Sequence, residues 1–175
     1  SELRDNAFEQ LHEPLGVVHR DVTPASLVLS VDGEIKVMDF GIAPSSSTSR
    51  GTGTGMVRLG SWTYMSPERK EGAQADHASD IYSLGLLLLE LLSPEPLPGL
   101  PISAPEHDAV LRAHVLGLGP LGMPNEAWSG ALADLLLQMT ASVSSHRPTA
   151  EQIVEVLRQY ADQAEGASLA DLAMN

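Results

Sequence analysis

A run of apolar residues at positions 81–92 constrains the fold of this 175-residue chain more than any other feature. Aliphatic side chains fall on nearly every face of a helix built from this segment, so other elements must enclose such a helix. The run is shorter than the ~20 residues of a membrane span, and it is interrupted by Ser83, Gly85 and Glu90. We therefore predict a buried helix from Asp80 to about Leu92 that forms the axis of the core.

Apolar residues at helical spacing predict four further helices, at about residues 3–12, 106–116, 128–139 and 149–160. In the third of these, one apolar stripe is expected from Ala131, Leu132, Leu135, Leu136 and Met139. Thr149 and Gln152 fit a capping box at the start of the last helix. Its buried face is expected to carry Ile153, Val156, Leu157 and Tyr160.

A β-hairpin is predicted over residues 27–38, because apolar residues alternate there on both sides of a turn signal. The alternation runs through Leu27, Leu29 and Val31, and resumes at Ile35 and Val37. Asp32-Gly33 between the two runs tolerates the positive φ angles of a tight turn. One hairpin among several helices indicates a mostly α (α+β) domain.

Composition excludes several classes of protein. Hydrophobic residues make up 43% and charged residues 19% of the chain, as expected for a folded globular domain. A formal net charge of −13 disfavours nucleic-acid binding. The absence of cysteine rules out disulfides and thiolate metal sites, and it suits a cytoplasmic location. No signal peptide is visible at Ser1, and the chain reads as a piece of something longer.

Five short motifs occur in a fixed order around the hairpin. They are His19-Arg20-Asp21, Asp39-Phe40-Gly41, Ser66-Pro67-Glu68, the segment 80–85 and His146-Arg147-Pro148. Each alone recurs by chance, but the ordered set resembles the C-terminal lobe of eukaryotic-like (bacterial Hanks-type) Ser/Thr protein kinases over about residues 2–160. The resemblance implies a partial kinase domain at residues 1–162, with the N-terminal lobe missing, and a tail at residues 163–175.

The resemblance also implies roles for individual residues. Asp21 would accept or orient the proton of the attacking substrate hydroxyl, and Asp39 would hold the Mg²⁺ that bridges the phosphates of ATP. Gly41 would let the chain turn, and Arg20 would pair with a phosphorylated activation segment. We expect Asp21 and Asp39 to lie at the rim of a single cleft, on opposite sides of the hairpin.

Supporting roles follow from the same resemblance. His19 would hold the catalytic loop, Asp80 would accept backbone hydrogen bonds from that loop, and Glu68 would form an ion pair with Arg147. Ser61 would contact the catalytic loop from the substrate-binding wall, where Trp62 replaces the usual proline. A Ser/Thr-rich loop is predicted at residues 45–55, with candidate phosphorylation sites at Ser49, Thr52 and Thr54.

Three departures from the family pattern weaken an enzyme reading. Thr23 stands where the catalytic lysine is usual, and as a catalytic residue its hydroxyl would donate one hydrogen bond without bringing a charge. Ser26 stands where a metal-binding asparagine is usual, and as a metal ligand it would supply a weaker oxygen from a shorter side chain. The third departure is that the ATP-covering half is absent: the chain contains two lysines, Lys36 and Lys70, and neither is placed to hold ATP phosphates. The glycine cluster at 51–55 lies in the wrong context for a phosphate loop.

Two functions therefore stay open. The first is the catalytic lobe of a Ser/Thr kinase that uses ATP and Mg²⁺ in an intact parent, the fragment alone being inactive and holding neither tightly. The second is a pseudokinase that acts as a protein-interaction scaffold. Expected partners are a protein substrate or regulator and the missing lobe, with no nucleic acid and no membrane segment in this chain.

Overall fold

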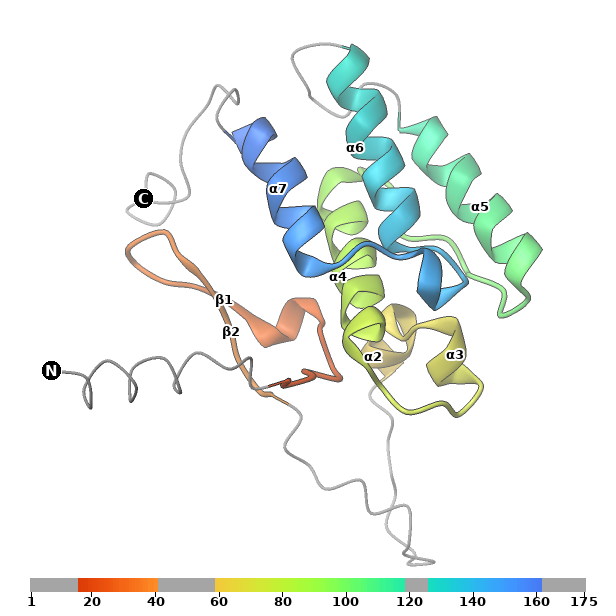
Figure 1. Cartoon of the computed structure of the whole chain (residues 1–175), viewed down its shortest axis with the longest axis horizontal. Helices are drawn as coiled ribbons and strands as arrows, with labels where there is room; N and C mark the ends of the chain where they lie inside the picture. The colour runs from red at the N-terminus through yellow and green to blue at the C-terminus, as the bar shows by residue number, and fades with distance from the viewer. Residues whose placement is uncertain (1–15, 41–58, 119–125, 162–175) are drawn as a thin grey trace, which may run out of the picture.

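A computed structural model describes residues 16–40, 59–118 and 126–161 (Figure 1). These ranges are mostly helical, with one two-stranded antiparallel sheet, as the sequence predicts. The predicted helix at 3–12, the loop at 45–55 and the tail at 163–175 lie outside the described residues. The same is true of four expected site residues: Gly41, Ser49, Thr52 and Thr54.

The described elements follow one another in a simple order. A short helix η2 (Pro24–Ser26) leads into β1 (Leu27–Leu29) and β2 (Ile35–Val37). After the gap come α2 (Leu59–Tyr64), α3 (Pro67–Lys70) and α4 (His77–Leu92). The remaining elements are α5 (Ala104–Gly117), α6 (Glu126–Met139), η3 (Ser144–His146) and α7 (Ala150–Ala161).

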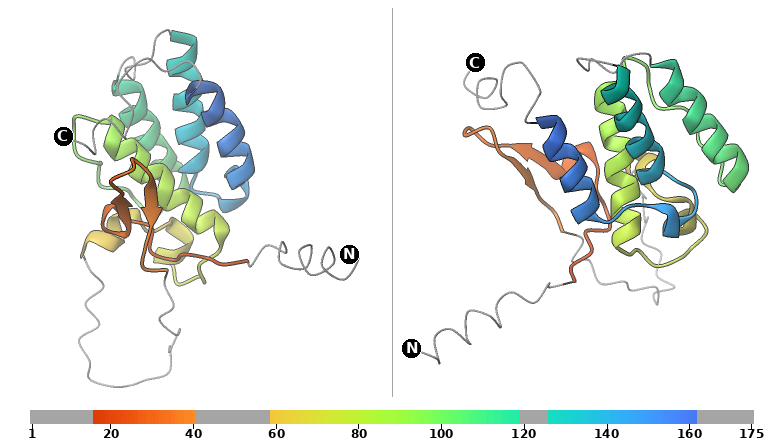
Figure 2. Two further views of the ribbon diagram at one scale, coloured as in Figure 1. Left: turned by 90° about the vertical axis from the view of Figure 1, so that its left-hand side faces the viewer. Right: turned by 45° about the horizontal axis from the view of Figure 1, so that its top comes forward.

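Helix α4 is the axis of the core, as predicted. Tyr82, Leu86 and Leu89 are fully buried, although Leu91 in the last turn is 74% exposed. Figures 1 and 2 show α6 against α4, α5 beyond α6, and the hairpin on the other side of α4. The core therefore lies between α4 and the helices that follow it.

The predicted start of this helix was wrong by one turn, because α4 begins at His77 and not at Asp80. The Asp76 carboxylate caps the helix, accepting hydrogen bonds from the Ser79 backbone N–H at 2.8 Å and from its hydroxyl at 2.9 Å. An aspartate at this position satisfies an otherwise free N–H of the first turn, so the helix begins three residues before Asp80.

The predicted stripe of α6 is confirmed at its four larger residues, since Leu132, Leu135, Leu136 and Met139 are buried. Ala131 is exposed, so its place in the stripe was wrong. Each residue of a helix advances about 100°, which puts Ala131 outside the sector that faces the core.

The capping box of α7 is present. The Thr149 N–H donates to Gln152 Oε1 at 2.8 Å, and the Gln152 N–H donates to Thr149 Oγ1 at 3.3 Å. Of the apolar residues expected on the buried face, Ile153 is 3% exposed, and Val156 and Leu157 are partly buried against the core. The Tyr160 side chain is not among those described.

The hairpin pairs Leu27 with Val37 and Leu29 with Ile35. Its turn is closed by the Gly33 N–H, which donates to the Ser30 carbonyl at 3.0 Å, and Gly33 has the positive φ of 78° that favours glycine. At the base of the hairpin, the Met38 N–H donates to the Ser26 carbonyl at 2.8 Å. These bonds join the segment before β1 to the segment after β2.

Across the described ranges, no helix combines the length and apolar character needed to cross a membrane.

Candidate functional site

The loop at residues 19–21 takes its backbone shape from a residue far along the chain. The Asp80 carboxylate accepts hydrogen bonds from the backbone N–H groups of His19, at 2.6 Å, and Arg20, at 2.8 Å. Arg20 has a φ of 73°, a left-handed conformation that a residue with a side chain adopts only at some cost. The first turn of α4 therefore stabilises a strained loop.

His19 joins this loop to the end of the hairpin. Its Nε2 lies 2.8 Å from the Met38 carbonyl oxygen, which can only accept, so Nε2 carries the hydrogen. Nδ1 then accepts from the Asp21 N–H at 3.3 Å, and the ring lies 4.9 Å from that of Phe40. Because both ring nitrogens are occupied and the residue is 5% exposed, His19 holds structure and is not placed to act as a base.

The His19 contact brings together the two segments that carry the expected catalytic carboxylates. Asp21 lies two residues after His19, and Asp39 directly follows Met38 with a φ of 59°. Both aspartates are exposed. Among the described residues, neither carboxylate has a hydrogen-bond or ion-pair partner, so four hard oxygen atoms face solvent near the base of the hairpin.

Thr23 and Ser26, at the two departing positions, face inward. They are 8% and 4% exposed. The Ser26 hydroxyl accepts from the Thr23 N–H at 3.0 Å and donates to the Thr23 carbonyl at 2.8 Å. The Ser26 hydroxyl oxygen, which the resemblance implies as a metal ligand, therefore closes the η2 turn instead.

Glu68 and Arg147 form the ion pair that the resemblance implies. Two guanidinium nitrogens donate to the two carboxylate oxygens at 2.7 and 2.8 Å, and the Arg147 side chain is completely buried. Arg147 also donates to the carbonyls of Ala141 and Ala78, and it lies 4.9 Å from the ring centre of Tyr82. Burial alone would raise the pKa of Glu68, but the hydrogen bonds and charge of Arg147 outweigh it and lower that pKa to about 2.

Helix α2 contains the residues for which the resemblance implies a substrate-binding wall. Ser61 lies in this helix, and its side chain is not among those described. Trp62 is 46% exposed, with the Lys70 ammonium 5.9 Å from the centre of its ring. Tyr64 donates a hydrogen bond to Glu90, and burial together with this carboxylate raises the pKa of Tyr64. Helix α2 is thus fastened to α4.

Arg69 makes a contact with the loop at residues 19–21 that the sequence did not predict. Its guanidinium Nη1 donates to the Arg20 carbonyl oxygen at 2.5 Å, linking α3 to the loop 49 residues earlier. The only signal in the sequence is a cationic residue directly after Ser66-Pro67-Glu68, and nothing in that spacing indicates which backbone group it reaches.

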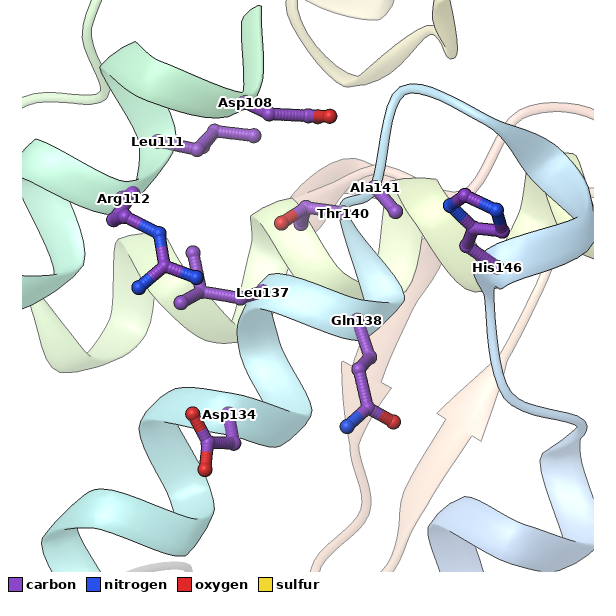
Figure 3. Close-up of a pocket in the computed structure, with 9 residues that line it drawn as sticks. All are labelled: Asp108, Leu111, Arg112, Asp134, Leu137, Gln138, Thr140, Ala141 and His146. Atoms are coloured by element: carbon purple, nitrogen blue, oxygen red, sulfur yellow. The ribbon is translucent and has the colours of Figure 1, made fainter.

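The described residues also border hollows in the surface. One, of about 310 Å³ between α5, α6 and the turn before α7, is bordered by Asp108, Arg112, Asp134 and His146 (Figure 3). These four side chains are exposed, so this hollow is an open depression to which we assign no ligand. A larger one, of about 640 Å³, borders Asp80 and Arg147.

The sequence profile of the protein kinase domain matches residues 5–157, and the chain belongs to this family. The tyrosine-protein kinase MasK of Myxococcus xanthus is 38% identical over 152 residues, which is 85% of this chain and 22% of MasK. The serine/threonine-protein kinase PknB of Mycobacterium leprae is 43% identical over 81 residues, 46% of this chain and 13% of PknB. The serine/threonine-protein kinase PknL of Mycobacterium tuberculosis is 44% identical over 78 residues, 45% of this chain and 19% of PknL.

The matched stretches therefore cover less than a quarter of each of these relatives. The described residues include the loops that carry Asp21 and Asp39, together with the helices that support those loops.

Proposed function

We propose that this chain is the catalytic lobe of a protein kinase that transfers the γ-phosphoryl group of ATP to Ser/Thr hydroxyls of a protein. The observation that carries the proposal is the pair of exposed carboxylates, Asp21 and Asp39, on two segments that His19 ties together. An N-terminal lobe in the intact parent would cover the nucleotide. The chain without such a lobe is then inactive and holds no ATP tightly.

Asp39 is the residue we propose for the metal. Mg²⁺ in such sites takes one or two carboxylates and fills its other positions with phosphate oxygens and water, and an exposed carboxylate fits that requirement. When bound, Mg²⁺ with ATP supplies the phosphoryl group and offsets its charge. The Ser26 hydroxyl already has both a donor and an acceptor among the described residues. We therefore propose Asp39, without Ser26, as the metal ligand.

Asp21 is the residue we propose to act on the substrate hydroxyl. Its loop is fixed by Asp80 and His19, so the carboxylate is held on a rigid backbone while remaining open to a peptide. A carboxylate in that position accepts the hydroxyl proton or orients the hydroxyl toward phosphorus. Thr23 brings no charge at the position where the family usually has lysine, so we expect a lower rate of phosphoryl transfer. The role proposed for Asp21 is unaffected by this change.

Regulation belongs to the same proposal. The Arg20 guanidinium is exposed, and a planar fork of N–H donors suits a phosphorylated side chain. We propose Ser49, Thr52 or Thr54 as the modified residue and Ser61 as a contact to the substrate-bound loop. We place the reaction in the cytoplasm, a reducing compartment in which a chain that forms no disulfides is at home.

A second candidate function is a pseudokinase scaffold, and one observation favours it. The Ser26 hydroxyl is occupied by hydrogen bonds to the Thr23 backbone, and the Thr23 residue is buried. Neither of the two altered positions therefore presents a charged group to a nucleotide. In that case the lobe would be retained for its surface, with a regulatory protein as partner.

The test is Mg²⁺-dependent phosphate incorporation by the full-length parent, compared with Asp21→Asn and Asp39→Asn. Removing a residue that acts on the reacting groups typically costs 10²- to 10³-fold or more, and we expect losses of at least roughly that size. Asp32→Asn is the matched control, because Asp32 is an exposed turn residue at the far end of the hairpin and asparagine suits the same turn. Its activity should equal that of the wild type.

Equal incorporation by all four proteins would contradict the roles of Asp21 and Asp39. Analysis of the phosphorylated amino acids separates Ser/Thr from Tyr acceptors, which matters because one relative is named a tyrosine kinase. A parent that neither binds Mg²⁺-ATP nor incorporates phosphate would favour the scaffold.

A further inference from the structure

The peptide unit between Arg20 and Asp21 is held by side chains at both of its polar groups. Its carbonyl oxygen accepts from Arg69 Nη1 at 2.5 Å, and its N–H donates to His19 Nδ1 at 3.3 Å. Helices and strands normally satisfy such groups with backbone partners. Here the unit lies outside regular structure, and two side chains from separate segments take that role.

The conformation of Arg20 makes this attachment important. A φ of 73° costs about 1 kcal/mol or more for a residue with a Cβ, so the loop keeps this shape only while its surroundings impose it. Asp80 fixes the N–H of Arg20 on one side of the residue. Arg69 fixes its carbonyl on the other side, and the plane of that carbonyl sets the direction in which the Asp21 side chain leaves the backbone.

Arg69 is itself carried on a firm support. It lies in α3, directly after Glu68, whose carboxylate is bound by the buried Arg147. The Ala73 N–H donates to the Glu68 carbonyl at 2.9 Å and closes the chain behind the helix. A guanidinium mounted in this way can hold a backbone oxygen in place, which a side chain on a loose loop could not do.

We propose that Arg69 is a positioning residue for phosphoryl transfer, fixing the Arg20–Asp21 peptide plane and through it the orientation of the Asp21 carboxylate. The inference rests on the proposed function for its kinetic consequence. Its structural consequence, the immobilised peptide plane, does not depend on catalysis. Arg69 contacts neither substrate nor metal in this proposal.

The experiment compares the full-length parent with Arg69→Ala and Arg69→Gln. Because misplacing a reacting group by about 1 Å can cost 10²-fold, we expect kcat of the alanine variant to fall roughly 10- to 100-fold with KM for ATP unchanged. Added guanidinium ion at low millimolar concentration should restore part of this loss, whereas equal sodium chloride should not. Arg158→Ala, which removes an exposed arginine from α7, is the matched control and should leave kcat unchanged.

Hydrogen exchange supplies a readout that needs no activity. We expect amides at residues 19–23 to exchange about 10-fold faster in both Arg69 variants, with exchange at residues 81–92 as in the wild type. If the variants instead exchange faster throughout, or if kcat and local exchange both stay at wild-type values, the positioning role is wrong. If the wild-type parent has no kinase activity, the proposed function fails, and the exchange result alone then decides whether Arg69 holds the loop.

Discussion

The acidic residues of the candidate site and its support fall into two chemically different groups. Asp21 and Asp39 are exposed and lack partners among the described residues, whereas Glu68 is bound by a fully buried arginine. Open carboxylates are free to meet a cation or a hydroxyl, while the Glu68 carboxylate is already committed to Arg147. Under the proposed function, carboxylates therefore serve chemistry in one place and stability in another.

The Glu68–Arg147 pair should make stability depend on pH. The folded-state pKa of Glu68 is about 2, below its ordinary 4.5, so its contribution is present above pH 4.5 and is lost as pH falls toward 2. With a quarter of the Glu68 side chain exposed, we expect the wild type to exceed Glu68→Gln by about 2–3 kcal/mol at pH 6. Urea unfolding of both proteins at a series of pH values measures this difference.

The difference should narrow steadily between pH 4.5 and 2. Glu34→Gln is the matched control, because Glu34 forms an exposed pair with Lys36 at 3.8 Å and should give a curve parallel to that of the wild type. A gap between wild type and Glu68→Gln that is the same at pH 6 and pH 2.5 would show that the pair does not have the protonation behaviour described.

At the scale of elements, α4 and α6 approach closely because α4 contains a glycine at the crossing. A Cβ at Gly85 would lie 2.8 Å from Met139 Cβ and 2.8 Å from Thr140 Cγ2. Both atoms lie within two bonds of a helix backbone and have little freedom to move away. The missing side chain of Gly85 thus sets the distance between the two central helices.

Gly85→Ala should therefore destabilise the protein even though alanine is the better helix former. The gain in helix propensity is about 1 kcal/mol, and overpacking a core typically costs about 1–3 kcal/mol, so we expect a net loss of roughly 1 kcal/mol. Gly130→Ala in α6 is the matched control, because nothing lies within 4 Å of the added carbon, and it should be neutral or stabilising. Thermal unfolding of the two variants distinguishes them, and a stabilised Gly85→Ala would refute the close crossing.

Elements were more predictable from the sequence than the connections between them. The enclosure of α4, the hairpin and the α7 cap follow from patterns within a few residues, and periodicity or capping chemistry reports these directly. The start of α4 was predicted three residues too late, because the apolar run begins only at Ile81 and the signal for the earlier start is a single capping residue, Asp76. The hydrogen bonds between Ser26 and the Thr23 backbone depend on the local backbone conformation. The hydrogen bond from Arg69 to the Arg20 carbonyl depends on folding that brings distant residues together. The spacing of residues within a short motif predicts neither.

At the scale of the whole molecule, the hairpin presents an apolar surface to solvent. Val31 is 80% exposed and Ile35 57%, and further apolar residues around them are 44–49% exposed: Val28, Leu29, Val37, Met38 and Phe40. Such a concentration of exposed apolar side chains favours contact with another surface. In the proposed parent, that surface belongs to the lobe that covers the nucleotide.

The 175-residue chain by itself should consequently self-associate and bind a hydrophobic dye. Replacing Val31 and Ile35 together with serine should lower dye fluorescence several-fold and shift sedimentation toward the monomer, since it removes the two most exposed residues of the surface. Val154→Ser, which changes an isolated apolar residue on α7 that is 44% exposed, should have little effect. A wild-type chain that is monomeric and does not bind the dye would contradict the prediction.

The bonds from Asp80 to His19 and Arg20 span about sixty positions of the chain. During synthesis the ribosome releases residues 19–21 well before residue 80 emerges, so the nascent loop has no anchor for several seconds at typical translation rates of about 5–20 residues per second. The working geometry of the loop can form only after α4 has left the exit tunnel. If the proposed function holds, the growing chain therefore stays catalytically silent until its central helix has been made.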